Sequence, residues 1–283
     1  MPKALEIITG QVTAPGGTIT ALTMSPGNSS TVRNAALNSY AALLQFWGRN
    51  NAAGVLRIRS PKLHDNVQGI RVRIPATDPN PLMTYYHNQR LVPQDTLTLE
   101  LSGSAVGGQI EQAAFLIYYT DLPGAASHLI GVPELLSRTN NVWTTEIPIT
   151  PGVAGFYSGQ VAINSAFDNF KANTEYALVG YHVDAQCTAV RFTGPDFANL
   201  GLGGPGLMNA TTAGESGRFL TARWFISLTE LLGIPLIPVF NAANKFGTLV
   251  DIMQNQAGAT VNVTAILHEI APMGSQGFSV GIA

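Results

Sequence analysis

Short segments in which apolar and polar residues alternate dominate this chain, and they constrain its fold more than any other feature. The clearest are residues 55–59 (VLRIR), 70–74 (IRVRI) and 96–101 (TLTLEL). Successive side chains of a β-strand point to opposite faces of a sheet, so a period of two is typical of strands with one buried face. Five further segments have strand length and composition: residues 113–119, 176–183, 189–193, 248–253 and 260–267.

Turn-forming clusters separate these segments, among them Pro15-Gly16-Gly17 and Pro26-Gly27-Asn28. Many short strands joined by Gly and Pro turns predict an all-β sandwich or barrel. Helical patterns are few. Residues 132–138 predict a short helix with Pro133 in its first turn. Residues 34–47 and 223–232 fit either a helix or a strand.

Six pairs of similar blocks occur in the same order in the two halves of the chain, which indicates an internal repeat. The pairs are 5–7 with 145–147, 40–41 with 176–177, 56–63 with 190–197, 81–87 with 235–241, 96–97 with 248–249, and 109–116 with 260–267. The sequence therefore predicts a first β-sandwich over residues 1–124, a linker over 125–141 and a second sandwich over 142–283. After the third pair the spacing grows by about 20 residues, which places a Gly-rich insertion around 198–218 and predicts surface loop there.

Catalytic and metal-binding patterns are missing from the sequence. The five histidines form no H-x-H or H-E-x-x-H motif, and His268 and Glu269 would point to opposite faces of a strand. Neither a G-x-S-x-G elbow nor a Walker A loop occurs, and residues 201–206 (GLGGPG) lack the Lys of a phosphate-binding loop. The single cysteine, Cys187, excludes an internal disulfide and is expected to be a buried thiol. We therefore predict that the protein is not an enzyme and binds no cofactor or small-molecule substrate.

Charged residues are scarce. Lys and Arg number 15 and Asp and Glu number 17, together about 11% of 283 residues, whereas soluble domains usually carry about 25%. A free monomer normally keeps charge on its surface, so this composition suits a chain packed against neighbours. The net charge of −2 gives no general reason to bind nucleic acid. The start MPKALEIITG predicts no signal peptide, and no apolar run is long enough to span a membrane.

Four arginines form the one distinctive charge pattern. Arg57 and Arg59 alternate with apolar residues in one predicted strand, and Arg71 and Arg73 do so in the next. Each strand would direct its two arginines away from the core. If the strands are neighbours, the four guanidinium groups form one patch that can meet phosphates, or carboxylates of a neighbouring subunit. The alternative is an ordinary solvated strand face.

With its two predicted sandwiches, its repeated strand blocks and its low charge, the chain resembles the double jelly-roll major capsid proteins of tailless viruses, such as the tectivirus and corticovirus groups. The resemblance covers most of the chain and is one of architecture. It implies an all-β fold of two tandem jelly rolls with a few short helices. It also implies a homotrimer that forms a pseudo-hexameric capsomer of an icosahedral shell, often over an internal membrane.

The resemblance further implies a virion protein, as in a bacteriophage, made in the host cytoplasm. Its partners would be further copies of itself, within and between capsomers, and other virion proteins. The patch of Arg57, Arg59, Arg71 and Arg73 would face the particle interior, where a membrane or genome lies, or a subunit contact. Two alternatives remain: a minor virion jelly-roll protein, and a tandem β-sandwich that is a carbohydrate-binding protein or a cupin-like enzyme. Carbohydrate binding would need exposed aromatic pairs, for which Tyr85-Tyr86 and Tyr118-Tyr119 are candidates.

Overall fold

The computed structural model describes residues 3–33, 41–62, 67–74, 85–122, 128–206, 221–254 and 256–271, and for 85–89 the backbone alone. The strands of the first half are β1 (Ala4–Thr13), β2 (Thr20–Ala21), β3 (Thr23–Met24), β4 (Ala41–Arg49), β5 (Gly54–Arg59), β6 (Ile70–Ile74), β7 (Tyr85–Leu91), β8 (Thr98–Leu101) and β9 (Ile110–Tyr119). The strands of the second half are β10 (His128–Ile130), β11 (Thr139–Ile149), β12 (Tyr157–Ala162), β13 (Glu175–Val183), β14 (Ala189–Thr193), β15 (Leu202–Pro205), β16 (Ile237–Asn241), β17 (Leu249–Met253) and β18 (Val261–Ile270).

The described helices are short: α1 (Val132–Arg138), α3 (Trp224–Leu232) and the 3₁₀ turns η2 (Pro195–Phe197) and η3 (Ala242–Asn244). All eight predicted strands form, and α1 has the predicted bounds. The two ambiguous segments resolve differently: residues 41–47 belong to strand β4, and residues 224–232 form helix α3. The elements β10 and α1 and the start of β11 lie within the segment 125–141 that the sequence assigns to a linker.

Each half of the chain folds into two antiparallel sheets. In the first half the strand orders are β3-β1-β9-β4-β7 and β2-β8-β5-β6, and in the second half they are β10-β16-β13-β18-β11 and β12-β17-β14-β15. Strands that come at corresponding points along the two halves also occupy corresponding positions in the sheets. In the five-stranded sheets β1 corresponds to β11, β9 to β18, β4 to β13 and β7 to β16. Eight of the nine described strands in each half match in this way, all except β3 and β10, and eight strands over two sheets make a jelly roll. The predicted all-β fold of two tandem jelly rolls is confirmed, and we call the halves roll 1 and roll 2.

Strand pairing defines which residues of the two rolls are equivalent. Opposite β9, strand β4 shifts register between Leu43 and Gln45, and opposite β18, strand β13 shifts register between Leu178 and Gly180. Matching these two bulges makes Leu43 equivalent to Leu178. The equivalence extends to charge, because Arg57 faces Glu100 across β5 and β8 while Arg191 faces Asp251 across β14 and β17.

The registers of the sequence blocks are correct only in part. The block 56–63 with 190–197 agrees with the strand pairing. Compared with the strand pairing, the sequence match of 109–116 with 260–267 is displaced by one residue. The match of 5–7 with 145–147 is displaced by three residues. A slip of one residue moves every side chain to the other face of the sheet. The block alignment matches Phe115, which is fully buried inside roll 1, with Ile266, which is only half-buried.

The Gly-rich residues 201–206 are not the surface loop that the sequence predicts. They include strand β15, which pairs with β14 and is buried along its whole length. A Cβ on Gly203 would lie 2.0 Å from the carbonyl oxygen of Val190, and one on Gly204 would lie 2.3 Å from Nε1 of Trp224. Glycine therefore serves here to bring backbone and side chains close together.

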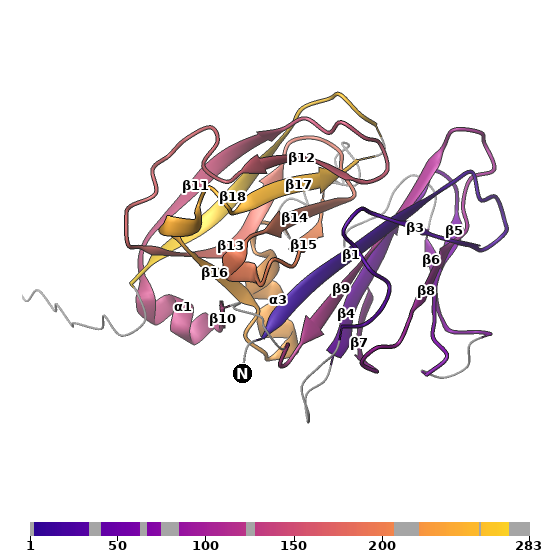
Figure 1. Ribbon diagram of the computed structural model, residues 1–283, viewed down its shortest axis with the longest axis horizontal. Coiled ribbons are helices and arrows are strands. Elements are labelled where there is room, and N and C mark those ends of the chain that lie inside the picture. The colour runs from indigo at the N-terminus through magenta and orange to yellow at the C-terminus, as the bar shows by residue number, and fades with distance from the viewer. Residues whose placement is uncertain are drawn as a thin grey trace, which may run out of the picture.

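The four sheets lie in one stack (Figure 1), from the five-stranded sheet of roll 2, through the four-stranded sheet of roll 2 and the five-stranded sheet of roll 1, to the four-stranded sheet of roll 1. Helix α3 packs against β13 and β16 and contributes the buried Trp224 and Phe225. No described helix has the length and apolar character needed to cross a membrane.

Candidate assembly faces

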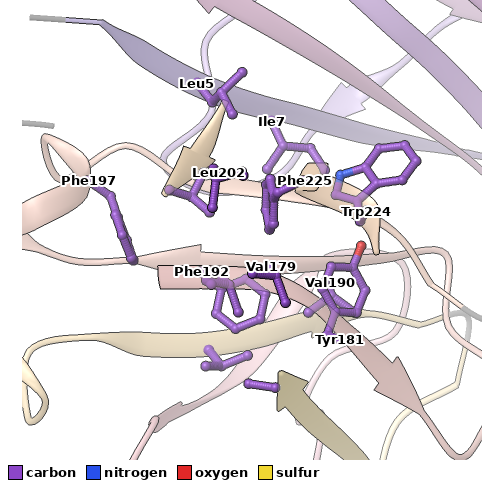
Figure 2. Packing of buried hydrophobic residues seen from close by; sticks show 14 of the residues in the cluster. Leu5, Ile7, Val179, Tyr181, Val190, Phe192, Phe197, Leu202, Trp224 and Phe225 are labelled. Carbon is purple, nitrogen blue, oxygen red and sulfur yellow. The ribbon is translucent and has the colours of Figure 1, made fainter. Parts of the chain in front are cut away.

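The two rolls make an extensive contact with each other inside the chain. Apolar residues on the outer face of the roll 1 five-stranded sheet belong to the same buried cluster as the core of roll 2: Leu5, Ile7, Leu44, Trp47 and Leu116. Figure 2 shows Leu5 and Ile7 above Leu202 of β15 and Phe225 of α3. The contact therefore joins the five-stranded face of roll 1 to the four-stranded face of roll 2.

Hydrogen bonds fix the position of this internal contact. The backbone N–H of Ile7 donates to the carbonyl oxygen of Gly201 at 2.6 Å. The indole Nε1–H of Trp47 donates to the carbonyl oxygen of Thr188 at 3.0 Å, and the Thr188 hydroxyl donates to Oε1 of Gln112 at 2.5 Å. Trp47 also packs edge-on against Trp224, with ring centroids 6.3 Å apart. The two rolls are thus held by directional bonds as well as by apolar packing.

A buried ion pair lies on the roll 2 side of this contact. Arg191 donates from Nε and Nη2 to the two carboxylate oxygens of Asp251, at 2.9 and 2.5 Å. Its guanidinium group lies 4.1 Å from the centroid of the Tyr157 ring. Burial raises the pKa of Asp251 even though Arg191 favours its charged form. A pair with this geometry needs both partners, because either charge alone would be buried without compensation.

The four predicted arginines lie on the outer face of the roll 1 four-stranded sheet. Arg57 is the direct neighbour of Arg71 across β5 and β6, and Val55 is the neighbour of Arg73. Arg71 and Arg73 are exposed, whereas Arg57 and Arg59 are half-buried. We call this surface, with Glu100, the arginine face. Four arginines and one glutamate give it a net charge of +3, and its role at an interface or the particle interior stays a prediction.

Glu100 is the residue of the arginine face that the sequence analysis missed. Its carboxylate accepts from Nε of Arg57 at 2.5 Å and from Nε and Nη2 of Arg59 at 2.8 and 2.7 Å. Burial opposes the charged form of Glu100, but hydrogen bonds from Arg59 and Arg57 outweigh it and lower the pKa of the carboxyl below its usual 4.5. The alternating segment TLTLEL could have revealed Glu100, since a period of two directs its side chain outward, away from the core.

Replacing Glu100 by glutamine is expected to lower the free energy of unfolding by about 1–3 kcal/mol at pH 7, because two arginines lose their charged partner. A lowered carboxyl pKa stabilises the fold above the unfolded-state pKa, and this contribution disappears as the pH falls through the folded-state value. Urea unfolding of both proteins at pH 7 and near pH 3 measures the difference. An equal loss of unfolding free energy at pH 7 and near pH 3 would contradict a stabilising role for the ionised Glu100 carboxylate.

At the other end of the stack lies the outer face of the roll 2 five-stranded sheet. Its exposed side chains on β11 include Val142, Thr144, Glu146 and Pro148. Close to them Asp184 accepts from the backbone and side-chain N–H groups of Asn262. We call this surface the acidic face. Within the described part of the chain Glu146 has no ion-pair partner.

The structure places the other residues that the sequence analysis weighed in separate contacts. His268 contacts the hydroxyl of Thr139, while Glu269 binds Lys171. The side chain of Cys187 is buried and forms no disulfide. Among the described residues no group of three His, Cys, Asp or Glu side chains could hold a metal ion.

Of the two aromatic pairs considered for carbohydrate binding, Tyr118-Tyr119 is buried. Tyr118 packs in the contact between the rolls, and Tyr119 donates from its hydroxyl to Glu6 inside roll 1. The side chains of Tyr85 and Tyr86 lie outside the described residues.

No protein-family model and no curated protein matches the chain. Among solved structures it is similar to the STIV MCP, with 9% identity over 99% of this chain and 100% of that chain and a TM-score of 0.23. It is also similar to the major capsid protein P2 from bacteriophage PM2, with 9% identity, 96% and 99% coverage and a TM-score of 0.20. The PBSX exported protein XepA has 12% identity, 88% and 94% coverage and a TM-score of 0.18.

Proposed function

We propose that this protein is a structural virion protein, the major capsid protein of an icosahedral tailless virus, and that three copies form a pseudo-hexameric capsomer. One observation carries the proposal. The two equivalent rolls of the chain stack head to tail, and in the described part of the chain one five-stranded face and one four-stranded face at the ends of the stack have no partner sheet.

The internal contact joins two different surfaces, the five-stranded face of roll 1 and the four-stranded face of roll 2. The two faces at the ends of the stack are of the same two kinds: the five-stranded face of roll 2 and the four-stranded face of roll 1. A second copy can therefore repeat the internal contact across chains. Head-to-tail contacts close into a ring when the rotation between neighbours permits it, and otherwise form an open filament. Three copies bring six similar rolls together, which gives a ring the outline of a hexagon.

Composition supports the same function. Interfaces between permanent partners are large, and their buried centres are depleted in charged residues. A chain with 11% charged residues is suited to such contacts. Jelly rolls also occur in lectins and cupins, and a fold by itself does not decide function. For this chain the stacking of the rolls is the feature that favours assembly. The virion is the location that follows from the proposal.

Light scattering after size-exclusion chromatography tests this function. A chain of 29.9 kDa is expected to elute as a species of about 90 kDa, three times the chain mass. Negative-stain images of that species should show a hexagonal outline. A monomer at every protein concentration would contradict the proposal. The number of copies per purified particle then distinguishes a major capsid protein from a minor virion protein.

A further inference from the structure

We propose that the acidic face of one copy binds the arginine face of the next, and that Glu146 and Arg71 lie opposite each other across this contact. The inference rests on the proposed function and names the surfaces that close the ring. It follows from using the internal contact between the rolls as a template for the contact between copies.

Strand pairing supplies the equivalent positions. Arg71 pairs with Arg57 across β5 and β6, and Gly203 pairs with Arg191 across β14 and β15, so Arg71 occupies the place of Gly203.

The position of Glu146 follows in the same way. Thr9 pairs with Ala114, and Glu146 pairs with Thr264. Once the bulges of β4 and β13 are matched, Glu146 occupies the place of Thr9.

The internal hydrogen bond from Ile7 to Gly201 sets the relative position of the two faces. The residues equivalent to this pair are Thr144 on β11 and Gly69, which directly precedes β6. Side chains two residues apart on a strand share a face. Glu146 is two residues beyond Thr144, and Arg71 is two residues beyond Gly69. The template therefore brings these two charges to the same region of the contact between copies.

The open edge of strand β11 supports this placement. In the described sheet β11 has a neighbour, β18, on one side only, so its other edge is unpaired. In the internal contact the equivalent strand β1 uses the N–H of Ile7 at that edge to bind the carbonyl oxygen of Gly201. An exposed strand edge invites pairing with another chain. A neighbouring copy that presents the backbone near Gly69 would give β11 the same partner.

Charge distinguishes the free faces from the paired ones. The residues Arg59, Arg71 and Arg73 on the arginine face correspond to Thr193, Gly203 and Pro205 on the paired face of roll 2. The acidic face carries Glu146 and Asp184, a charge of −2 against +3 on the arginine face. Complementary charges steer association and disfavour contacts between two like faces. They would hold roll 1 and roll 2 in alternation around the ring.

A charge exchange tests the contact. Glu146→Arg and Arg71→Glu are each expected to raise the dissociation constant of the trimer by about 100-fold, because like charges then face each other. The double variant Glu146→Arg/Arg71→Glu restores opposite charges and should assemble with a dissociation constant within about tenfold of the wild type. Matched controls are Glu230→Arg and Arg223→Glu, which alter an exposed pair 3.6 Å apart at helix α3. Thermal unfolding of each variant checks that it is folded.

Three outcomes would overturn the inference. If the wild type is trimeric and both single variants stay trimeric, the inference fails while the proposed function stands. If the single variants dissociate and the double variant does not recover, the two residues do not face each other. If Arg71→Glu keeps the trimer but loses binding to vesicles of anionic lipid, the arginine face binds phosphates instead. A monomeric wild type would contradict the proposed function itself.

Discussion

Replacing Trp47 by alanine is expected to lower the free energy of unfolding by about 3–5 kcal/mol, the usual cost of removing a large aromatic side chain from a core. Trp47 is 4% exposed and lies between the rolls, edge-on to Trp224 and hydrogen-bonded to the carbonyl oxygen of Thr188. Its loss would leave a cavity and remove one of the two hydrogen bonds that the Thr188 carbonyl oxygen accepts, the other coming from the backbone N–H of Gly206. Because the contact couples the rolls, calorimetry should show two transitions where the wild type shows one.

Trp47→Phe is the control for this result. Phenylalanine keeps most of the apolar packing against Trp224 but cannot donate a hydrogen bond to Thr188. We expect it to cost about 1–2 kcal/mol and to leave a single transition. If Trp47→Ala cost less than about 1 kcal/mol, the internal contact would be far weaker than the packing indicates.

Replacing Asp251 by alanine is the second large effect, with an expected loss of about 3–5 kcal/mol of unfolding free energy. The substitution leaves the Arg191 guanidinium charged and without its carboxylate partner in the buried contact between the rolls, against the Tyr157 ring. Chemical denaturation at neutral pH measures the loss. Since the side chain of Asp251 is only 4% exposed, solvent cannot replace it.

The double variant Arg191→Met/Asp251→Leu separates pairing from packing. Replacing both charges by apolar side chains of similar size is often neutral or stabilising. We therefore expect the double variant to be more stable than Asp251→Ala. A double variant as unstable as the single one would mean that the cost comes from lost packing, and that the ion pair contributes little.

Strand identity was predictable because it is local. The alternation in residues 55–59 and 70–74 sets which side chains share a face, and β5 and β6 place Arg57 beside Arg71 across the two strands. Helix α1 was predictable for a similar reason, since Pro133 fits the first turn of a helix.

Residues whose conformation depends on distant partners could not be predicted. Gly203 and Gly204 resemble loop residues in the sequence, yet they form a buried strand because β14 and Trp224 leave no room for larger side chains. Glu100 could be assigned to an outward face, but its pairing with Arg57 and Arg59 requires β8 to lie next to β5.

The sequence by itself determined that this protein is built from two similar sets of strands with few charged residues and one cluster of arginines. The tertiary structure decided the register of the repeat, the order of the four sheets and which faces stay free. The physical reason is the period of two along a strand, which fixes the faces of that strand but carries no information about its neighbour. A shift of one residue between Phe115 and its counterpart reverses the buried face, and only packing of the whole sheet selects the correct register.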